Sequence, residues 1–127
     1  MSHSKSDVSL YEVVYEVIPN LNIAEKLVNN TLKSLREEAS NPLDMLRRKE
    51  QQEALGLEIH HVRMNLEHLL ERYRDEVAEL VRTEGREKGP IVTPDPFEAQ
   101  AIRSAVDIYQ HVRAYQRGER RHPLPGR

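Results

Sequence analysis

The chain has 127 residues, of which 38% are hydrophobic and 31% are charged, with 19 Lys and Arg against 21 Asp and Glu. This length suits one domain with a single modest core, and the composition argues against a disordered chain and against nucleic-acid binding as the main role. The chain contains no cysteine, which excludes disulfides, thiolate metal sites and cysteine nucleophiles.

No membrane or export signal is evident in the sequence. No stretch approaches the roughly 20 apolar residues that a membrane-spanning helix needs. The first ten residues, MSHSKSDVSL, lack the apolar core of a signal peptide. We therefore expect a cytoplasmic protein that does not contact a membrane.

The first two predicted elements are helices separated by a proline. Residues 7–18 (DVSLYEVVYEVI) combine strand-favouring Val and Tyr with an apolar helix face, and no second strand is evident to pair with them. We predict a helix there, which Pro19 should stop. Asn22 followed three residues later by Glu25 is typical of a capping box and predicts a second helix over 22–39.

The third predicted element is one long helix over 42–84. Asn41 and Pro42 suit the cap and the first helical position, and no strong breaker follows before Gly85. Such a helix would be roughly 60 Å long, which exceeds the width of a domain of this size. It must therefore either bend near Gly56 or project from the rest of the chain.

The last predicted helix covers 96–117 and begins at Pro94-Asp95-Pro96. The apolar face that we expect it to bury consists of Phe97, Ala101, Ala105, Ile108, Val112 and Tyr115.

We predict a single helical domain over 1–118, followed by a flexible basic tail over 119–127. The basic end of the chain includes Arg113, Arg117, Arg120 and Arg121. It could contact phosphate, although a net charge of −2 gives little support for a nucleic-acid partner.

The long helix carries two apolar lines. One is spaced alternately by four and three residues, as in a coiled-coil seam, and consists of Leu55, Ile59, Val62, Leu66, Leu69 and Tyr73. The other flanks it and consists of Leu57, Met64, Leu70 and Val77. So wide an apolar arc needs more than one neighbouring helix. We therefore predict an all-α helical bundle with one long central helix, which forms a homodimer and binds a partner protein through the seam residues and Arg63.

Six residues of the long helix resemble a ribonuclease motif. Arg63 and His68 have the Arg-x-x-x-x-His spacing of HEPN ribonucleases, which are all-helical and often dimeric. The resemblance implies that Arg63 would steady the scissile phosphate and that His68 would act as general acid and base, without a metal.

A metal site and a cofactor site are not predicted. Glu58 and His61 lie one turn apart, as in helical di-iron bundles, but such a site also needs a second pair of this kind and two more carboxylates that point into a common interior. The residues favour a regulatory or adaptor module that binds a macromolecular partner through its long helix. The alternative is a metal-independent ribonuclease.

Overall fold

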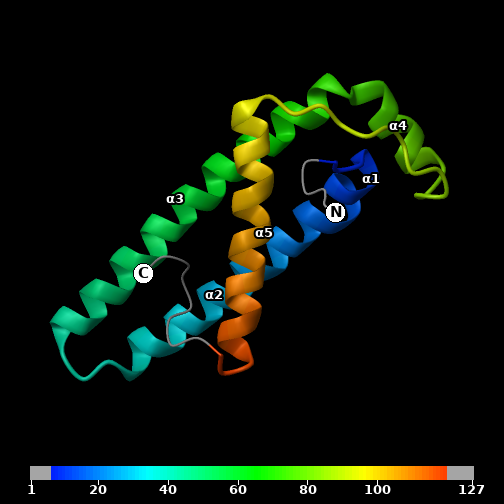
Figure 1. The fold of residues 1–127 in the computed structure, drawn as a ribbon. Coiled ribbons are helices and arrows are strands. Elements are labelled where there is room, and N and C mark those ends of the chain that lie inside the picture. Colours follow the sequence, from blue (N-terminus) through cyan, green and yellow to red (C-terminus); the bar gives the residue numbers. More distant parts are fainter. Residues whose placement is uncertain (1–6, 120–127) are drawn as a thin grey trace.

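The computed structural model describes residues 7–119, and its regular structure is entirely helical over this range. Three long helices pack against one another: α2 (Ile18–Glu38), α3 (Pro42–Arg72) and α5 (Pro96–Gln116). Helices α2 and α3 lie side by side in antiparallel directions, and α5 crosses both on one face (Figure 1). The predicted all-α fold class is confirmed.

The core lies where α2, α3 and α5 meet. Each helix contributes apolar residues three or four positions apart, which is the spacing of one buried helix face. The buried residues of the three helices include Leu21, Ala24, Val28, Leu32, Leu55, Ile59, Val62, Leu66, Leu69, Ala101, Ile102, Ala105, Ile108 and Val112. The predicted seam of α3 is therefore packed inside its own chain.

Helical structure continues through Pro19, where the sequence predicted a stop. Before α2 lie α1 (Leu10–Glu12) and a π-helical turn, η1 (Val13–Val17), in which the Ile18 amide donates to the Val13 carbonyl five residues earlier. Pro19 then falls in the first turn of α2, directly after this π-helical turn. The predicted capping-box residues Asn22 and Glu25 consequently lie inside α2 rather than at its start.

The predicted helix over 42–84 is divided into two. Helix α3 ends at Arg72, and α4 (Arg74–Arg82) begins after Tyr73, whose φ of −110° and ψ of 29° are not helical. At this break, Tyr73 Oη accepts a hydrogen bond of 2.9 Å from the Thr93 amide, and Arg72 donates to the Thr93 carbonyl at 2.9 Å. Because these contacts are to the segment that leads into α5, they fix the chain where α3 ends. Near Gly56, in contrast, α3 is uninterrupted.

The N-terminal segment is paired with the segment before α5. The Leu10 amide donates to the Pro90 carbonyl at 2.8 Å, and the Val92 amide donates to the Val8 carbonyl at 2.8 Å. Ser9 and Ile91 form an isolated antiparallel bridge between these two bonds. This pairing holds the first helical turn close to the end of the molecule that carries α4 (Figure 1).

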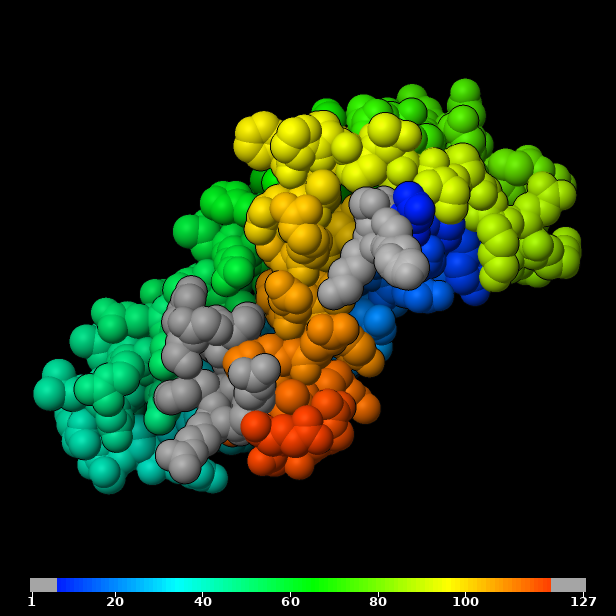
Figure 2. Space-filling model, in the orientation of Figure 1, coloured from blue at the N-terminus to red at the C-terminus, as the bar shows by residue number. Residues whose placement is uncertain are grey.

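One end of the α2–α3 pair, residues 33–54, extends beyond α5 (Figure 2). We call this segment the hairpin tip. It contains no buried residue, because the last buried residue of α2 is Leu32 and the first of α3 is Leu55. Polar groups join the two helices here, and Arg36 donates to Gln52 at 3.1 Å. The apolar core therefore stops short of the tip.

Candidate functional site

A buried carboxylate lies at the junction of α3 and α5. Glu98, in the first turn of α5, has no exposed surface, and Arg72 from the last turn of α3 contacts both of its carboxylate oxygens. Arg72 Nη2 donates to Oε1 at 2.6 Å, and Arg72 Nε donates to Oε2 at 3.1 Å. The Asp95 amide also donates to Oε1 at 2.9 Å, as the second half of a capping box. A charge removed from water is thus paired with the opposite charge.

His68 completes this cluster. Its Nδ1 lies 2.6 Å from Glu98 Oε2, one turn of α3 before Arg72. The side chain of His68 is 61% exposed, although the carboxylate that it contacts is buried. The ring is therefore held from inside the protein while most of it faces solvent. We call Glu98, Arg72, His68 and Asp95 the Glu98 cluster.

The Glu98 cluster lowers the pKa of its carboxyl group. Hydrogen bonding from Arg72 has the largest effect, and hydrogen bonds from the Asp95 amide and His68 act in the same direction, against the opposing effect of burial. Together these effects lower the pKa of Glu98 from 4.5 to about 2. The pKa of Arg72 is raised, chiefly by the same hydrogen bonding. Glu98 is therefore ionised at neutral pH.

The same residues include three candidate metal ligands. Ligand atoms of His68, Asp95 and Glu98 lie within 4.8 Å of one another. Both Glu98 oxygens, however, already accept hydrogen bonds from Arg72, whose positive charge would repel a cation. A metal would have to displace this guanidinium, so the cluster fits an ion pair better than a metal site.

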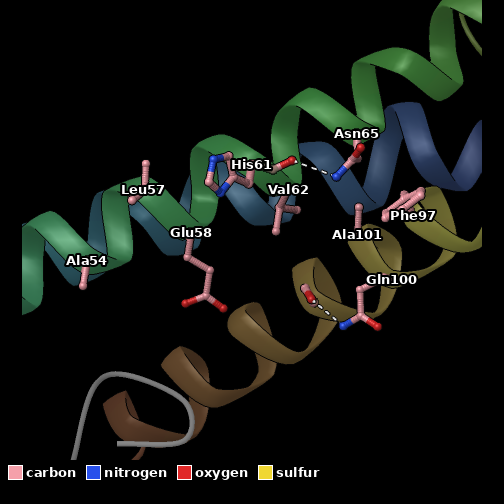
Figure 3. A pocket seen from close by; sticks show the side chains of 10 residues that line it. Ala54, Leu57, Glu58, His61, Val62, Asn65, Phe97, Gln100 and Ala101 are labelled. Atoms are coloured by element: carbon pink, nitrogen blue, oxygen red, sulfur yellow. Dashed lines mark hydrogen bonds between the residues drawn. The ribbon is translucent and has the colours of Figure 1, made fainter.

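A groove adjoins the Glu98 cluster between α3 and α5. It has a volume of about 500 Å³, and Val62 and Ala101 from the two helices form part of its floor (Figure 3). Phe97 lies toward one end and is 74% exposed, whereas Leu57 lies toward the other and is 59% exposed (Figure 3). The prediction that Phe97 is buried was therefore wrong. His61 lies on the α3 side of the groove and is one of its polar residues. We call this space the α3–α5 groove.

The predicted binding residues are mostly covered within the chain. Tyr73 is partly buried against the core, and the remaining apolar members of the seam are buried: Leu55, Ile59, Val62, Leu66 and Leu69. Their burial follows because α3 packs against both α2 and α5. A partner that binds through α3 would therefore have to use a different face of this helix.

Arg63 and His68 contact different helices. Arg63 Nη2 donates to Asn22 Oδ1 at 2.6 Å and to Glu25 Oε1 at 2.8 Å, both on α2. His68 instead contacts Glu98 on α5. Residues five positions apart in a helix lie about 140° apart around its axis, because each residue turns the helix by about 100°. The two residues of the ribonuclease-like motif are thus directed to separate neighbours.

The predicted basic end is only partly described. Arg113 and Arg117 lie at the exposed end of α5, and Arg117 Nε donates to Glu119 at 3.1 Å. Arg120 and Arg121, together with the rest of the predicted tail, lie outside the described residues.

The Glu98 cluster was not predicted from the sequence. The pattern Asp95-Pro96-Phe97-Glu98 is a local signal for a helix start, but it does not show that Glu98 also binds Arg72, which is distant in sequence.

Within residues 7–119, no helix combines the length and the apolar content that a membrane crossing requires. Comparisons of the chain with protein-family models, curated proteins and solved structures find no match.

Proposed function

We propose that this protein is a helical interaction module that binds an apolar segment of a macromolecular partner in the α3–α5 groove. The observation that carries the proposal is the exposure of Phe97, which is 74% exposed beside the buried apolar floor of the groove. Covering a large aromatic side chain contributes roughly 1.5–3 kcal/mol, and aromatic side chains are common anchors of protein interfaces.

The Glu98 cluster supports this assignment because it makes one wall of the groove rigid. Glu98 follows Phe97 directly in the sequence, and its side chain is fixed by Arg72. The backbone that carries Phe97 is therefore tied to α3 before any partner binds. A preorganised surface loses less conformational entropy on binding than a mobile one, so it binds more tightly for the same contacts.

The proposal retains the predicted role of the long helix but changes the residues involved. The buried floor contains Val62, one of the seam residues, whereas the accessible part of the α3 wall includes Leu57 and His61. The partner that suits this groove is a protein segment with apolar side chains on one face and polar groups at its edges. A regulatory or adaptor role would follow from the identity of that partner.

Affinity capture with a matched pair of variants tests the proposal. Wild-type protein, Phe97→Ser and Val81→Ser would each be immobilised and exposed to lysate from the source cells. Val81 lies on α4 and is 56% exposed, so it controls for the loss of any exposed apolar residue. We expect a protein that is recovered with wild type and Val81→Ser but not with Phe97→Ser. Equal recovery with all three would contradict binding in the groove.

A metal-independent ribonuclease is the second proposal, and one observation favours it. His68 contacts a buried carboxylate through Nδ1, which is the arrangement that orients many acid–base histidines and leaves Nε2 toward solvent. Incubation of the protein with mixed RNA in the presence of a chelator tests this activity. Cleavage that is lost in both His68→Ala and Arg63→Ala would support the Arg-x-x-x-x-His reading. Cleavage that is equal in wild type and His68→Ala would end it.

A further inference from the structure

The chain leaves α5 on the side of the α3–α5 groove. Gly118 is eighteen residues after Gln100, which corresponds to about five helical turns, so it follows the face of α5 on which Gln100 lines the groove. Gly118 has a φ of +81°, and the Glu119 amide donates back to the Ala114 carbonyl at 2.9 Å. This is a Schellman motif, which ends the helix at a left-handed residue. The residues that follow therefore start on the groove side of α5.

The remaining chain is long enough to run back into the groove. Gly118 lies about 21 Å along α5 from Ser104, the last groove-lining residue of this helix. Residues 119–127 span about 30 Å when extended, at about 3.3 Å per residue. Leu124 is six residues beyond Gly118, so an extended chain carries it about 20 Å back, to the level at which the groove opens.

Residues 120–127 also have the apolar residue that this end of the groove requires. Leu124 stands between Pro123 and Pro125, and prolines in these positions favour an extended backbone over a helix. Toward the end of the groove that carries Leu57, α3 and α5 diverge (Figure 3). Leu57 is 59% exposed there, so contact with a second apolar side chain would remove apolar surface from water.

Opposite charges favour the same segment. Residues 120–127 contain three arginines and no Asp or Glu. Glu58 is the only Asp, Glu, Lys or Arg that lines the groove, and its side chain extends from α3 toward α5 (Figure 3). The next charged positions along the same sides of the two helices are Glu50, Asp107, Arg47 and Arg103. Because Arg47 is already paired with Asp44 at 2.9 Å, carboxylates prevail around this end of the groove.

We propose that residues 120–127 fold back into the α3–α5 groove of their own chain, with Leu124 against Leu57 at the end where Glu58 lies. The docked segment and the apolar segment of a partner then compete for one site. A partner binds only those molecules whose groove is open, so its apparent affinity falls in proportion to the open fraction. This regulation rests on the proposed function, whereas the docking itself does not.

Disulfide trapping in the full chain tests the docking, because the sequence contains no cysteine. Gly126→Cys places one thiol in the tail and leaves Leu124 and the arginines intact. The second thiol is either Ser104→Cys, which lines the groove, or Val106→Cys, which lies about 200° further around α5 at nearly the same height. Equilibration with reduced and oxidised glutathione gives the effective concentration of each thiol pair, which we expect to be at least about tenfold higher at Ser104.

Leu124→Ser separates docking from the mere nearness of Ser104 to the end of α5. We expect it to lower the effective concentration of the Ser104 pair severalfold and to leave the Val106 pair unchanged. Glu58→Gln should act in the same direction with a smaller effect, and circular dichroism would establish that each variant retains its helices. Equal values at the two positions, or a Ser104 value that does not respond to Leu124→Ser, would overturn the docking. Disulfide-linked dimers in place of closed monomers would also overturn it, because the tail would then occupy a second copy.

Affinity capture from the lysate distinguishes failure of this inference from failure of the proposed function. If the tail competes with the partner, Leu124→Ser should recover more of the Phe97-dependent protein than wild type does. Equal recovery by the two would overturn the regulation and leave the proposed function intact. A tail that is trapped at Ser104 without any captured partner would support the docking and count against the proposed function.

Discussion

Arg72 and Glu98 join the end of α3 to the start of α5 through two hydrogen bonds, of 2.6 Å and 3.1 Å. The two residues are brought together by the fold alone, because the α4 helix and the following segment separate them in the sequence. A buried carboxylate depends strongly on its partner, since removal of one member of a buried pair leaves the other charge without compensation.

We expect Arg72→Met to lower the free energy of unfolding by about 2–4 kcal/mol, because Glu98 would remain buried without its main donor. Urea denaturation at neutral pH would measure this change. Arg82→Met is the control, because the Arg82–Glu79 pair on α4 is exposed and solvent screens it, so its loss should change the free energy of unfolding little. A similar loss of unfolding free energy in the two variants would show that the buried Arg72–Glu98 pair stabilises the fold no more than the exposed Arg82–Glu79 pair does.

Stability should fall in acid, and Glu98 should account for a large part of the fall. Its pKa is about 2 in the folded protein and is expected near 4.5 when the chain is unfolded, so the unfolded state binds more protons between these values. The contribution of Glu98 is therefore complete above about pH 5 and is lost as the pH falls toward 2; its full size is at most about 3 kcal/mol.

The comparison variant for this pH dependence is Glu98→Gln, which cannot titrate. Urea denaturation of both proteins between pH 7 and pH 3 would show a steeper loss for wild type, and the difference between the two curves should narrow toward acid. Parallel curves over the whole range would mean that Glu98 has the same pKa in the folded and unfolded states.

Arg63 should stabilise the packing of α3 against α2. It donates to Asn22 and Glu25 at 2.6 Å and 2.8 Å, and both members of the Arg63–Glu25 pair are about one-third exposed. We expect Arg63→Met to cost about 1 kcal/mol of unfolding free energy, since solvent screens part of the ion pair. In a double-mutant cycle with Glu25→Gln, the two losses should be less than additive. Strict additivity would show that the pair is not coupled.

Two glycines should respond to alanine in opposite directions. Gly56 lies inside α3 with open space where a Cβ would be, so Gly56→Ala should stabilise the protein by about 0.5–1 kcal/mol. Gly85 has a φ of +80°, and a Cβ there would lie 3.0 Å from the Tyr11 ring, so Gly85→Ala should destabilise it. Thermal unfolding measured by circular dichroism would compare them. A lower melting temperature for Gly56→Ala would contradict this reading of α3.

The start of α5 could be predicted because its signals are local. Asp95 caps the helix, Pro96 suits its first turn, and Glu98 completes the capping box within four residues. The same kind of local reasoning failed at Pro19 and Tyr73. At Pro19 the chain stays helical, with a π-helical turn directly before it. At Tyr73 the helix is interrupted by contacts to Thr93, although no glycine or proline in the sequence marks this position.

The candidate site was harder to predict than the fold class. The heptad spacing identified the buried face of α3 correctly as apolar, but it could not say whether the same chain or a partner would cover it. Phe97 has the right spacing to join the buried face of α5 and is nevertheless exposed, because α3 and α5 leave a groove at that level. Such outcomes depend on how helices cross, which periodicity within one helix does not determine.

The π-helical turn Val13–Val17 has a consequence for the segment that leads into α5. One surplus residue in a helical turn rotates everything before it by about 100° relative to an unbroken α-helix. In this rotated setting the Leu10 amide donates to the Pro90 carbonyl at 2.8 Å. Deletion of a single residue between Val13 and Val17 would therefore swing the first turn away from Pro90 and leave the approach to α5 without its backbone anchor.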